Sequence, residues 1–254
     1  MTLKTKLLNN QLTIGAWITL GHPTIAEIFS NAGFDWVTID LEHSVISLRD
    51  AEELIRTVEL SGTTPLVRLT SNSPEQIKRV MDAGSHGIIV PMVNSVDDAV
   101  KAIQSVRYPT TGTRGVGLAR AQRWGNRFSE YLDWLEKESV VIVQIEHIDA
   151  ANCIEEILDV EGVDGLIIGP YDLSGSMGIP GQFDDPDFID VMNKIKTAAS
   201  NKNKTSGVHV VEPDPIELQK RINEGYRFIA YSLDTRMLDV VSRSCLDNIN
   251  KASE

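Results

Sequence analysis

The side chains with the greatest chemical reactivity lie at or just beyond the ends of short apolar runs. They are Asp40, His43, Arg68, Glu146, Asp172 and His209. If the runs are parallel strands of one barrel, their carboxyl ends meet at a single rim and bring these side chains together. Carboxylates, an arginine and imidazoles at one rim can bind a metal ion, hold an anionic substrate and transfer a proton.

Two carboxylates form a candidate metal site. Glu146 follows the run Val140–Ile145, and Asp172 follows the next run, Val163–Ile168. Carboxylate oxygens, with water and substrate completing the shell, suit a hard divalent cation such as Mg²⁺ or Mn²⁺. The alternative is that one of the two acids caps a helix or pairs with an arginine.

Arg68 and His43 are candidates for substrate binding and proton transfer. A guanidinium at the rim can donate two parallel hydrogen bonds to a carboxylate substrate, whereas the alternative for Arg68 is a salt bridge to Asp40 or Glu42. An imidazole oriented by a nearby carboxylate, as His43 would be by Asp40, can accept and return a proton.

Backbone donors and a buried imidazole complete the set. Gly169-Pro-Tyr-Asp172 would place amide N–H groups beside a metal-held carboxylate, and the glycine-rich stretch Leu173–Gly181 is predicted as a loop that binds an anion or simply turns at the surface. His209 lies in Gly207–Val211, which is too apolar for a surface strand, so its ring faces either the barrel interior or the surrounding helices.

The lysines and cysteines argue against covalent catalysis. A Schiff-base aldolase needs a lysine that points into the barrel, and no lysine falls inside an apolar run. Neither cysteine lies at a predicted strand end, and no Walker A, CxxC or HExxH motif is found. Carbanion chemistry here would therefore require a metal ion.

The elements that position these residues are short apolar runs separated by amphipathic stretches. The eight runs are Thr13–Ile18, Trp36–Leu41, Pro65–Leu69, Gly87–Val90, Val140–Ile145, Val163–Ile168, Gly207–Val211 and Arg227–Tyr231. The helical patterns are Ala51–Glu59 after a cap at Asp50, Pro74–Met81, Asp97–Val106, Ala150–Leu158, Pro186–Ala199 and Pro215–Asn223. Nearly continuous apolar runs are typical of strands buried on both faces.

This alternation predicts a (β/α)8 TIM barrel, an α/β fold whose active site lies at the carboxyl ends of the strands. The competing doubly wound sheet usually opens with a glycine-rich dinucleotide fingerprint, which is missing after the first run. A chain of 254 residues fits one such barrel, so residues 1–254 are expected to form a single domain. The irregular stretch Arg107–Gly125 is long enough to be functional.

Charge and composition exclude several partners. Lys and Arg number 24 against 36 Asp and Glu, and the net charge of −12 disfavours nucleic acid and anionic membranes as partners. No apolar run approaches the roughly 20 residues of a membrane span. Two cysteines cannot form a disulfide framework, which favours a cytoplasmic location.

From Gly15-Ala-Trp17 to the last run, the chain resembles the class II, metal-dependent pyruvate aldolases of the hydroxy-oxo-heptanedioate aldolase and 2-dehydro-3-deoxyglucarate aldolase family. The matching segments are Ala32-Gly-Phe-Asp-Trp36, Ile39-Asp-Leu-Glu-His43, Val67-Arg68, Val90-Pro-Met92, Arg107-Tyr-Pro109, Gly112-Thr-Arg-Gly-Val-Gly117, Val143-Gln-Ile-Glu146, Val160-Glu-Gly-Val-Asp-Gly165 and Gly169-Pro-Tyr-Asp-Leu-Ser174.

The resemblance implies a role for each candidate. Glu146 and Asp172 would bind Mg²⁺, Mn²⁺ or Co²⁺, Arg68 would hold the keto oxygen of pyruvate, and the amides of Tyr171 and Asp172 beside Gly169 would hold its carboxylate. His43 would transfer a proton with the help of Asp40, or of Asp82 from a neighbouring subunit, and Trp17 would wall the pocket. The family also implies a hexamer, a trimer of dimers that exchange their last helix.

Four departures from the family pattern concern the aldehyde half of the substrate. Leu41, Ser44, Tyr171 and His209 stand where relatives have other residues. His209 is either a core histidine or lies at the pocket mouth near Arg120 or Arg123, where it would contact the aldehyde.

We therefore expect a lyase that reversibly cleaves a 4-hydroxy-2-oxo acid into pyruvate and an aldehyde through a metal-stabilised enolate. The alternatives are oxaloacetate decarboxylation or another reaction of the pyruvate enolate, and a non-catalytic barrel that binds a keto acid.

Overall fold

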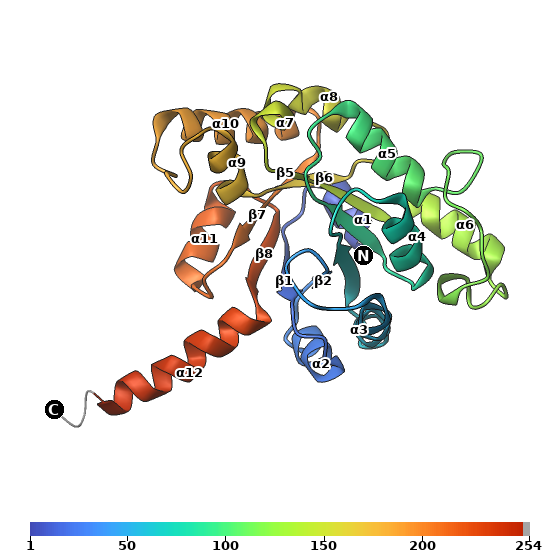
Figure 1. The fold of residues 1–254 in the computed structure, drawn as a ribbon, viewed down its shortest axis with the longest axis horizontal. Helices are drawn as coiled ribbons and strands as arrows, with labels where there is room; N and C mark the ends of the chain where they lie inside the picture. The colour runs from blue at the N-terminus through green and yellow to red at the C-terminus, as the bar shows by residue number, and fades with distance from the viewer. Residues whose placement is uncertain (251–254) are drawn as a thin grey trace.

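A closed barrel of eight parallel strands forms the centre of the molecule. The structure is a computed structural model that describes residues 1–250, and side chains as far as Leu246. The strands are β1 Thr13–Ile18, β2 Trp36–Asp40, β3 Thr64–Arg68, β4 Gly87–Val90, β5 Val140–Ile145, β6 Gly165–Ile168, β7 Thr205–Val210 and β8 Phe228–Leu233. Each strand pairs with the next, and β8 pairs with β1. The predicted (β/α)8 barrel is confirmed (Figure 1).

Helices surround the barrel and connect its strands (Figure 1). They are α1 Leu3–Leu8, α2 Pro23–Asn31, α3 Leu48–Leu60, α4 Pro74–Asp82, α5 Val96–Val106, the 3₁₀ turn η1 Arg120–Gln122, α6 Phe128–Lys137, α7 Ile148–Asn152, α8 Ile154–Asp159, α9 Pro170–Ser176, α10 Pro186–Asn201, α11 Pro215–Asn223 and α12 Asp234–Asn250. Among the described helices, none is long and apolar enough to cross a membrane.

Three local expectations are wrong. The cap of α3 is Ser47, whose hydroxyl accepts the Asp50 N–H in a reciprocal capping box, so Asp50 is the third helical residue. The predicted helix Ala150–Leu158 is two helices that meet at Cys153. The first part of the predicted loop Leu173–Gly181 is helical, because Pro170 starts α9 immediately after β6.

Large side chains fill the amino-terminal end of the barrel interior, away from the candidate site residues. Trp36 and Phe228 stack with their ring centroids 4.3 Å apart. Room for the Trp36 ring exists because Gly15 has no side chain. Leu3 and Leu7 of α1 pack against this cluster and close the amino-terminal end of the barrel. These large side chains thus occupy the amino-terminal layers of the interior, and polar groups occupy the carboxyl rim.

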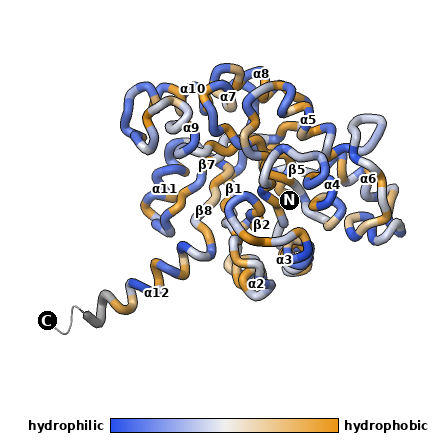
Figure 2. The backbone as a smooth tube through the Cα atoms, viewed as in Figure 1, coloured by the Kyte–Doolittle hydropathy of each residue, from blue (hydrophilic) through white to orange (hydrophobic). Residues whose placement is uncertain are grey.

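The last helix leaves the body of the molecule. Figure 1 shows α12 extending away from the barrel, and Figure 2 shows hydrophobic and hydrophilic residues alternating along it. Leu238, Val241 and Leu246 are exposed on this helix. A second helical surface would be needed to cover them.

Replacement of Gly15 by alanine should destabilise the barrel. A Cβ at this position would overlap the Trp36 ring, and overpacking of a closed core typically costs about 1–3 kcal/mol. Urea denaturation measures this loss. Gly115→Ala is the matched control, since no atom lies within 4 Å of a Cβ there. Equal unfolding free energies for the two variants would contradict the packing described.

Candidate active site

The carboxyl rim of the barrel collects the predicted site residues. Asp40 and Arg68 end β2 and β3 and are direct neighbours in the strand register. Glu146 follows β5, and Asp172 lies in the first turn of α9, directly after β6. His209 is the penultimate residue of β7. The structure therefore places these five side chains on one rim, as the sequence predicts.

Arg68 is held in one orientation by Asp40 and Trp17. Its Nε and Nη2 donate to the two Asp40 carboxylate oxygens at 2.8 and 2.6 Å, so the pair has fork geometry. Its guanidinium carbon lies 4.3 Å from the centroid of the Trp17 ring. The salt bridge considered for Arg68 is thus present, and it leaves Nη1 as the edge free for a substrate.

Glu42 is a site residue that the sequence analysis did not single out. Its Oε2 lies 3.4 Å from Arg68 Nε and 3.8 Å from His43 Nε2, but this oxygen is buried without a hydrogen-bond partner. Burial raises the pKa of Glu42 to about 7, and Arg68 opposes this shift. The signal available in the sequence is its spacing of two from Asp40, which puts both acids at the end of one strand.

Glu146 is buried and held from two sides. Its Oε1 accepts from Gln144 Nε2 at 2.5 Å, and its Oε2 accepts the Met92 N–H at 3.0 Å. Burial raises the pKa of the Glu146 carboxyl. A Cβ at Gly169 would lie only 2.7 Å from Glu146 Oε1, so glycine is what allows the next strand end to pass so close to this carboxylate.

Asp172 is exposed at the amino terminus of α9. Gly169 precedes the helix without a side-chain cap, and the Tyr171 and Asp172 amides belong to the first turn, where N–H groups have no intrahelical partner. The Tyr171 ring is also exposed and meets Phe183 edge to face. Two amide donors without an intrahelical partner and one exposed carboxylate thus lie near Glu146.

The donor set at this rim fits a metal bound by two protein carboxylates. Among the described residues there is no cluster of three or more histidine, cysteine or acidic side chains with metal-binding geometry. The buried, unpartnered Glu42 Oε2 can accept a hydrogen bond from a metal-bound water. The chemistry of the residues present therefore fits a hard cation that keeps most of its water.

His43 and Asp82 lie differently from the other candidates. The His43 imidazole is exposed, and Asp40 contacts this residue only through the His43 backbone N–H, at 3.4 Å. The nearest carboxylate to the ring is that of Glu42 rather than Asp40. Asp82 ends α4 at the opposite rim, where its carboxylate lies 3.6 Å from Arg114. Within one chain Asp82 does not approach His43.

His209 faces the barrel interior. Its ring centroid is 5.6 Å from that of Trp17, and its Nε2 is buried without a partner. Burial, together with the nearby Arg68 charge, lowers the pKa of His209 to about 4. The expectation that Arg120 or Arg123 lies near this ring is wrong within the chain, because both arginines pair with Glu59 at the opposite rim.

Comparison with known proteins identifies the family. A model of the HpcH/HpaI aldolase/citrate lyase family matches residues 13–239. The chain is 38% identical over 228 residues to a 4-hydroxy-2-oxo-heptane-1,7-dioate aldolase of Escherichia coli, a match that covers 89% of this chain and 86% of that protein.

Solved structures agree with this match. A family protein from Burkholderia cenocepacia J2315 superposes with a TM-score of 0.92 at 31% identity, covering 98% of both chains. The citrate synthase SbnG superposes with a TM-score of 0.86 at 26% identity, covering 100% of this chain and 99% of that one.

The fold and these matches define a barrel enzyme of the carbon–carbon lyase class, with an aldolase architecture. The chain belongs to the HpcH/HpaI aldolase/citrate lyase family. The predicted family and enzyme class are confirmed.

The partly buried His209 should make stability depend on pH. Its pKa is about 4 in the folded chain and 6.5 in the unfolded chain, so the unfolded state binds more protons between these values and stability falls as pH is lowered through this window. From pH 7.5 to 5 the wild type should lose about 2 kcal/mol more than His209→Leu. Urea denaturation at both pH values measures the difference, and parallel losses would place the ring in contact with water.

Proposed function

We propose that the protein is a divalent-metal-dependent aldolase that reversibly cleaves a 4-hydroxy-2-oxo acid into pyruvate and an aldehyde. The observation that carries the proposal is the Glu146 carboxylate, fixed by Gln144 and Met92 and passed closely by Gly169 on the way to Asp172. The 4-hydroxy-2-oxo-heptane-1,7-dioate aldolases among the relatives support an acid of this class. A 2-dehydro-3-deoxy sugar acid is the other substrate of the same type.

Glu146 and Asp172 would hold the cation, which we propose to be Mg²⁺, Mn²⁺ or Co²⁺. When bound, it would supply Lewis-acid polarisation of the substrate keto oxygen. The amides of Tyr171 and Asp172 would donate to the substrate carboxylate, because they are free at the start of α9. Together these groups would fix the orientation of the keto acid.

Arg68 would stabilise negative charge on the keto oxygen as the carbon–carbon bond breaks. Asp40 and Trp17 fix its guanidinium before the substrate arrives, so no reorganisation is needed during the reaction. His43 would take the proton from the 4-hydroxyl group, a role for which an imidazole is well suited near neutral pH.

The acid that assists His43 would be Asp40, which fixes the local backbone, or Asp82 of a neighbouring subunit. Glu42, the carboxylate nearest the imidazole, adds a third candidate in the same chain. An intersubunit role for Asp82 requires that the opposite rim of one chain reach the active site of another.

His209 and Tyr171 would select the aldehyde. His209 faces the barrel interior beside Trp17, and Tyr171 is exposed at the start of α9 on the same rim. The unpartnered Nε2 of His209 can bond a polar tail, whereas an aliphatic residue cannot. We therefore propose that polar aldehydes are preferred.

We also propose one domain over residues 1–254, assembled as a hexamer in which dimers exchange α12. The exposed Leu238, Val241 and Leu246 support a partner surface for this helix. A reducing, cytoplasmic location is supported by the two free cysteines, Cys153 and Cys245.

A second candidate function uses the same site with another substrate. Oxaloacetate decarboxylation, or a different bond formed by the enolate, is favoured by the likeness to a citrate synthase at 26% identity. Metal-dependent release of pyruvate from oxaloacetate, without turnover of any hydroxy-oxo acid, would select it. A non-catalytic keto-acid sensor would instead bind pyruvate without turnover.

The metal requirement is tested by pyruvate release from a panel of 4-hydroxy-2-oxo acids with Mg²⁺, Mn²⁺ or Co²⁺. EDTA and Glu146→Gln should each abolish release, and Gly169→Ala should lower it by roughly tenfold or more because the new Cβ displaces the Glu146 carboxylate. Gly175→Ala is the matched control in the same helix, with open space around its Cβ. Full activity after complete metal removal would overturn the proposal.

Arg68→Lys should lower kcat by about 10²–10³, since the ammonium keeps the charge but loses the fork that Asp40 and the substrate share. Steady-state kinetics of pyruvate release measure the effect. Arg56→Lys, on the exposed face of α3, is the control and should leave kcat unchanged. A kcat of the Arg68→Lys enzyme within a few-fold of wild type would reduce Arg68 to an ion-pair partner of Asp40.

A further inference from the structure

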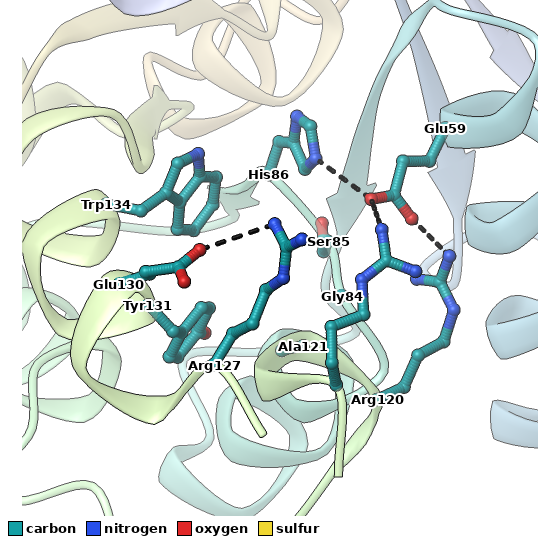
Figure 3. A pocket seen from close by; sticks show the side chains of 11 residues that line it. Glu59, Gly84, Ser85, His86, Arg120, Ala121, Arg127, Glu130, Tyr131 and Trp134 are labelled. Atoms are coloured by element: carbon teal, nitrogen blue, oxygen red, sulfur yellow. Dashed lines mark hydrogen bonds and ion pairs between the residues drawn. The ribbon is translucent and has the colours of Figure 1, made fainter. Parts of the chain in front are cut away.

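A second cavity lies at the amino-terminal rim, on the opposite side of the barrel from Glu146. It measures about 270 Å³ and is lined by the end of α3, the joint between α4 and β4, the turn η1 and helix α6 (Figure 3). We call it the rim cavity and define it by Glu59, His86, Arg123, Arg127, Tyr131 and Trp134. None of these residues takes part in the proposed aldolase chemistry.

One side of the rim cavity carries an excess of positive charge. Glu59 accepts from Arg120 and also lies 3.9 Å from both Arg123 Nη2 and His86 Nε2. The neighbouring His86 and Arg120 side chains lower the pKa of Glu59 to about 2, so it stays ionised. Arg120 is further fixed by the Ala83 carbonyl at 2.9 Å. The single negative charge of Glu59 therefore faces two guanidiniums, those of Arg120 and Arg123. Its contact with Arg123 is the longer of the two.

Arg127 is the cation most available to a ligand. Its only ion pair among the described residues is with Glu130, at 3.3 Å, and both side chains are more than half exposed. Exposed pairs of this kind contribute little stability, so a bound anion can replace Glu130 at small cost. Figure 3 shows the Arg127 guanidinium between the Trp134 ring and the ion pair of Glu59 and Arg120.

The other side of the rim cavity is aromatic. The rings of Tyr131 and Trp134 are stacked, with centroids 5.5 Å apart and planes 17° from parallel. The His86 ring meets Trp134 edge to face at 5.2 Å. This arrangement fixes the Trp134 indole as a rigid wall beside the arginines, and a flat ring can pack on such a wall with little loss of entropy.

We propose that the rim cavity is a binding site for a small aromatic carboxylate, with the carboxylate on Arg127 and Arg123 and the ring against Trp134. The volume of about 270 Å³ accommodates one ring and its acid group. The guanidiniums recognise the carboxylate and the indole recognises the ring. An aliphatic acid lacks the ring and a neutral aromatic compound lacks the charge, so each should bind more weakly.

Calorimetric titration of the metal-loaded protein with three probes tests the proposal. Benzoate carries both recognised features, acetate carries the carboxylate alone, and benzyl alcohol carries the ring alone. Benzoate should bind roughly tenfold or more tightly than either of the others. Similar affinities for acetate and benzoate would reduce the site to a nonspecific anion patch and overturn the proposal, as would the absence of benzoate binding.

The benzoate affinities of three variants test whether the ligand binds in the rim cavity. Arg127→Gln should weaken benzoate binding about tenfold or more through the loss of a charge-assisted contact, and Trp134→Leu should weaken it several-fold. Arg56→Gln, the same change on an exposed arginine outside the rim cavity, should have no effect. Since Arg127 is exposed and remote from the active rim, Arg127→Gln should retain wild-type pyruvate release and thermal stability.

The Glu146→Gln variant distinguishes benzoate binding in the rim cavity from binding in the active site. Benzoate binding should survive this substitution if the ligand occupies the rim cavity. Loss of binding in Glu146→Gln, with unchanged binding in Arg127→Gln, would place benzoate in the active site and overturn the proposal.

Discussion

The paired hydrogen bonds between Arg68 and Asp40 set the geometry of the active rim. They form because β2 and β3 pair in a register that makes these two residues direct neighbours. A slip of one residue would turn one of them out of the barrel. The ion pair also leaves three further carboxylates, Glu42, Glu146 and Asp172, around a guanidinium whose charge is already compensated.

Burial and this surplus of negative charge together determine the pKa values of the rim carboxylates. Burial and mutual repulsion raise the pKa values of Glu42 and Glu146, which means that their ionised forms lack compensation in the protein alone. A divalent cation would offset two of the three surplus charges. The Met92 N–H, directed at Glu146 by a backbone with a positive φ of 52°, offsets part of this charge, and Gly169 leaves room for the Glu146 carboxylate.

The strands could be predicted closely because they are buried on both faces and therefore continuous in apolar residues. β1, β4 and β5 begin and end as expected. The two polar residues that open β7, Thr205 and Ser206, were missed because their side chains are buried through contacts distant in the sequence, such as the bond from the Thr205 hydroxyl to the Leu7 carbonyl. Such a contact spans most of the chain and leaves no local pattern.

The rim residues were predictable as a group, but not their partners. Position at a strand end indicates which side chains share the rim, and this identified Asp40, Arg68, Glu146, Asp172 and His209. It does not indicate which carboxylate reaches which imidazole, since that depends on side-chain torsions, and Glu42 rather than Asp40 lies beside the His43 ring. The joining of Arg120 to Glu59 depends likewise on the path of the long segment after α5.

Closure of the barrel sets a condition on synthesis of the chain. The buried Asp234 carboxylate accepts the Thr19 N–H at 3.0 Å across 215 residues, just where β8 completes the ring beside β1. A nascent chain on the ribosome thus carries one unpaired edge of β1 until β8 has emerged. During that interval the edge is open to pairing with other chains, so the last strand ends the period in which this protein is most exposed to aggregation and to chaperone binding.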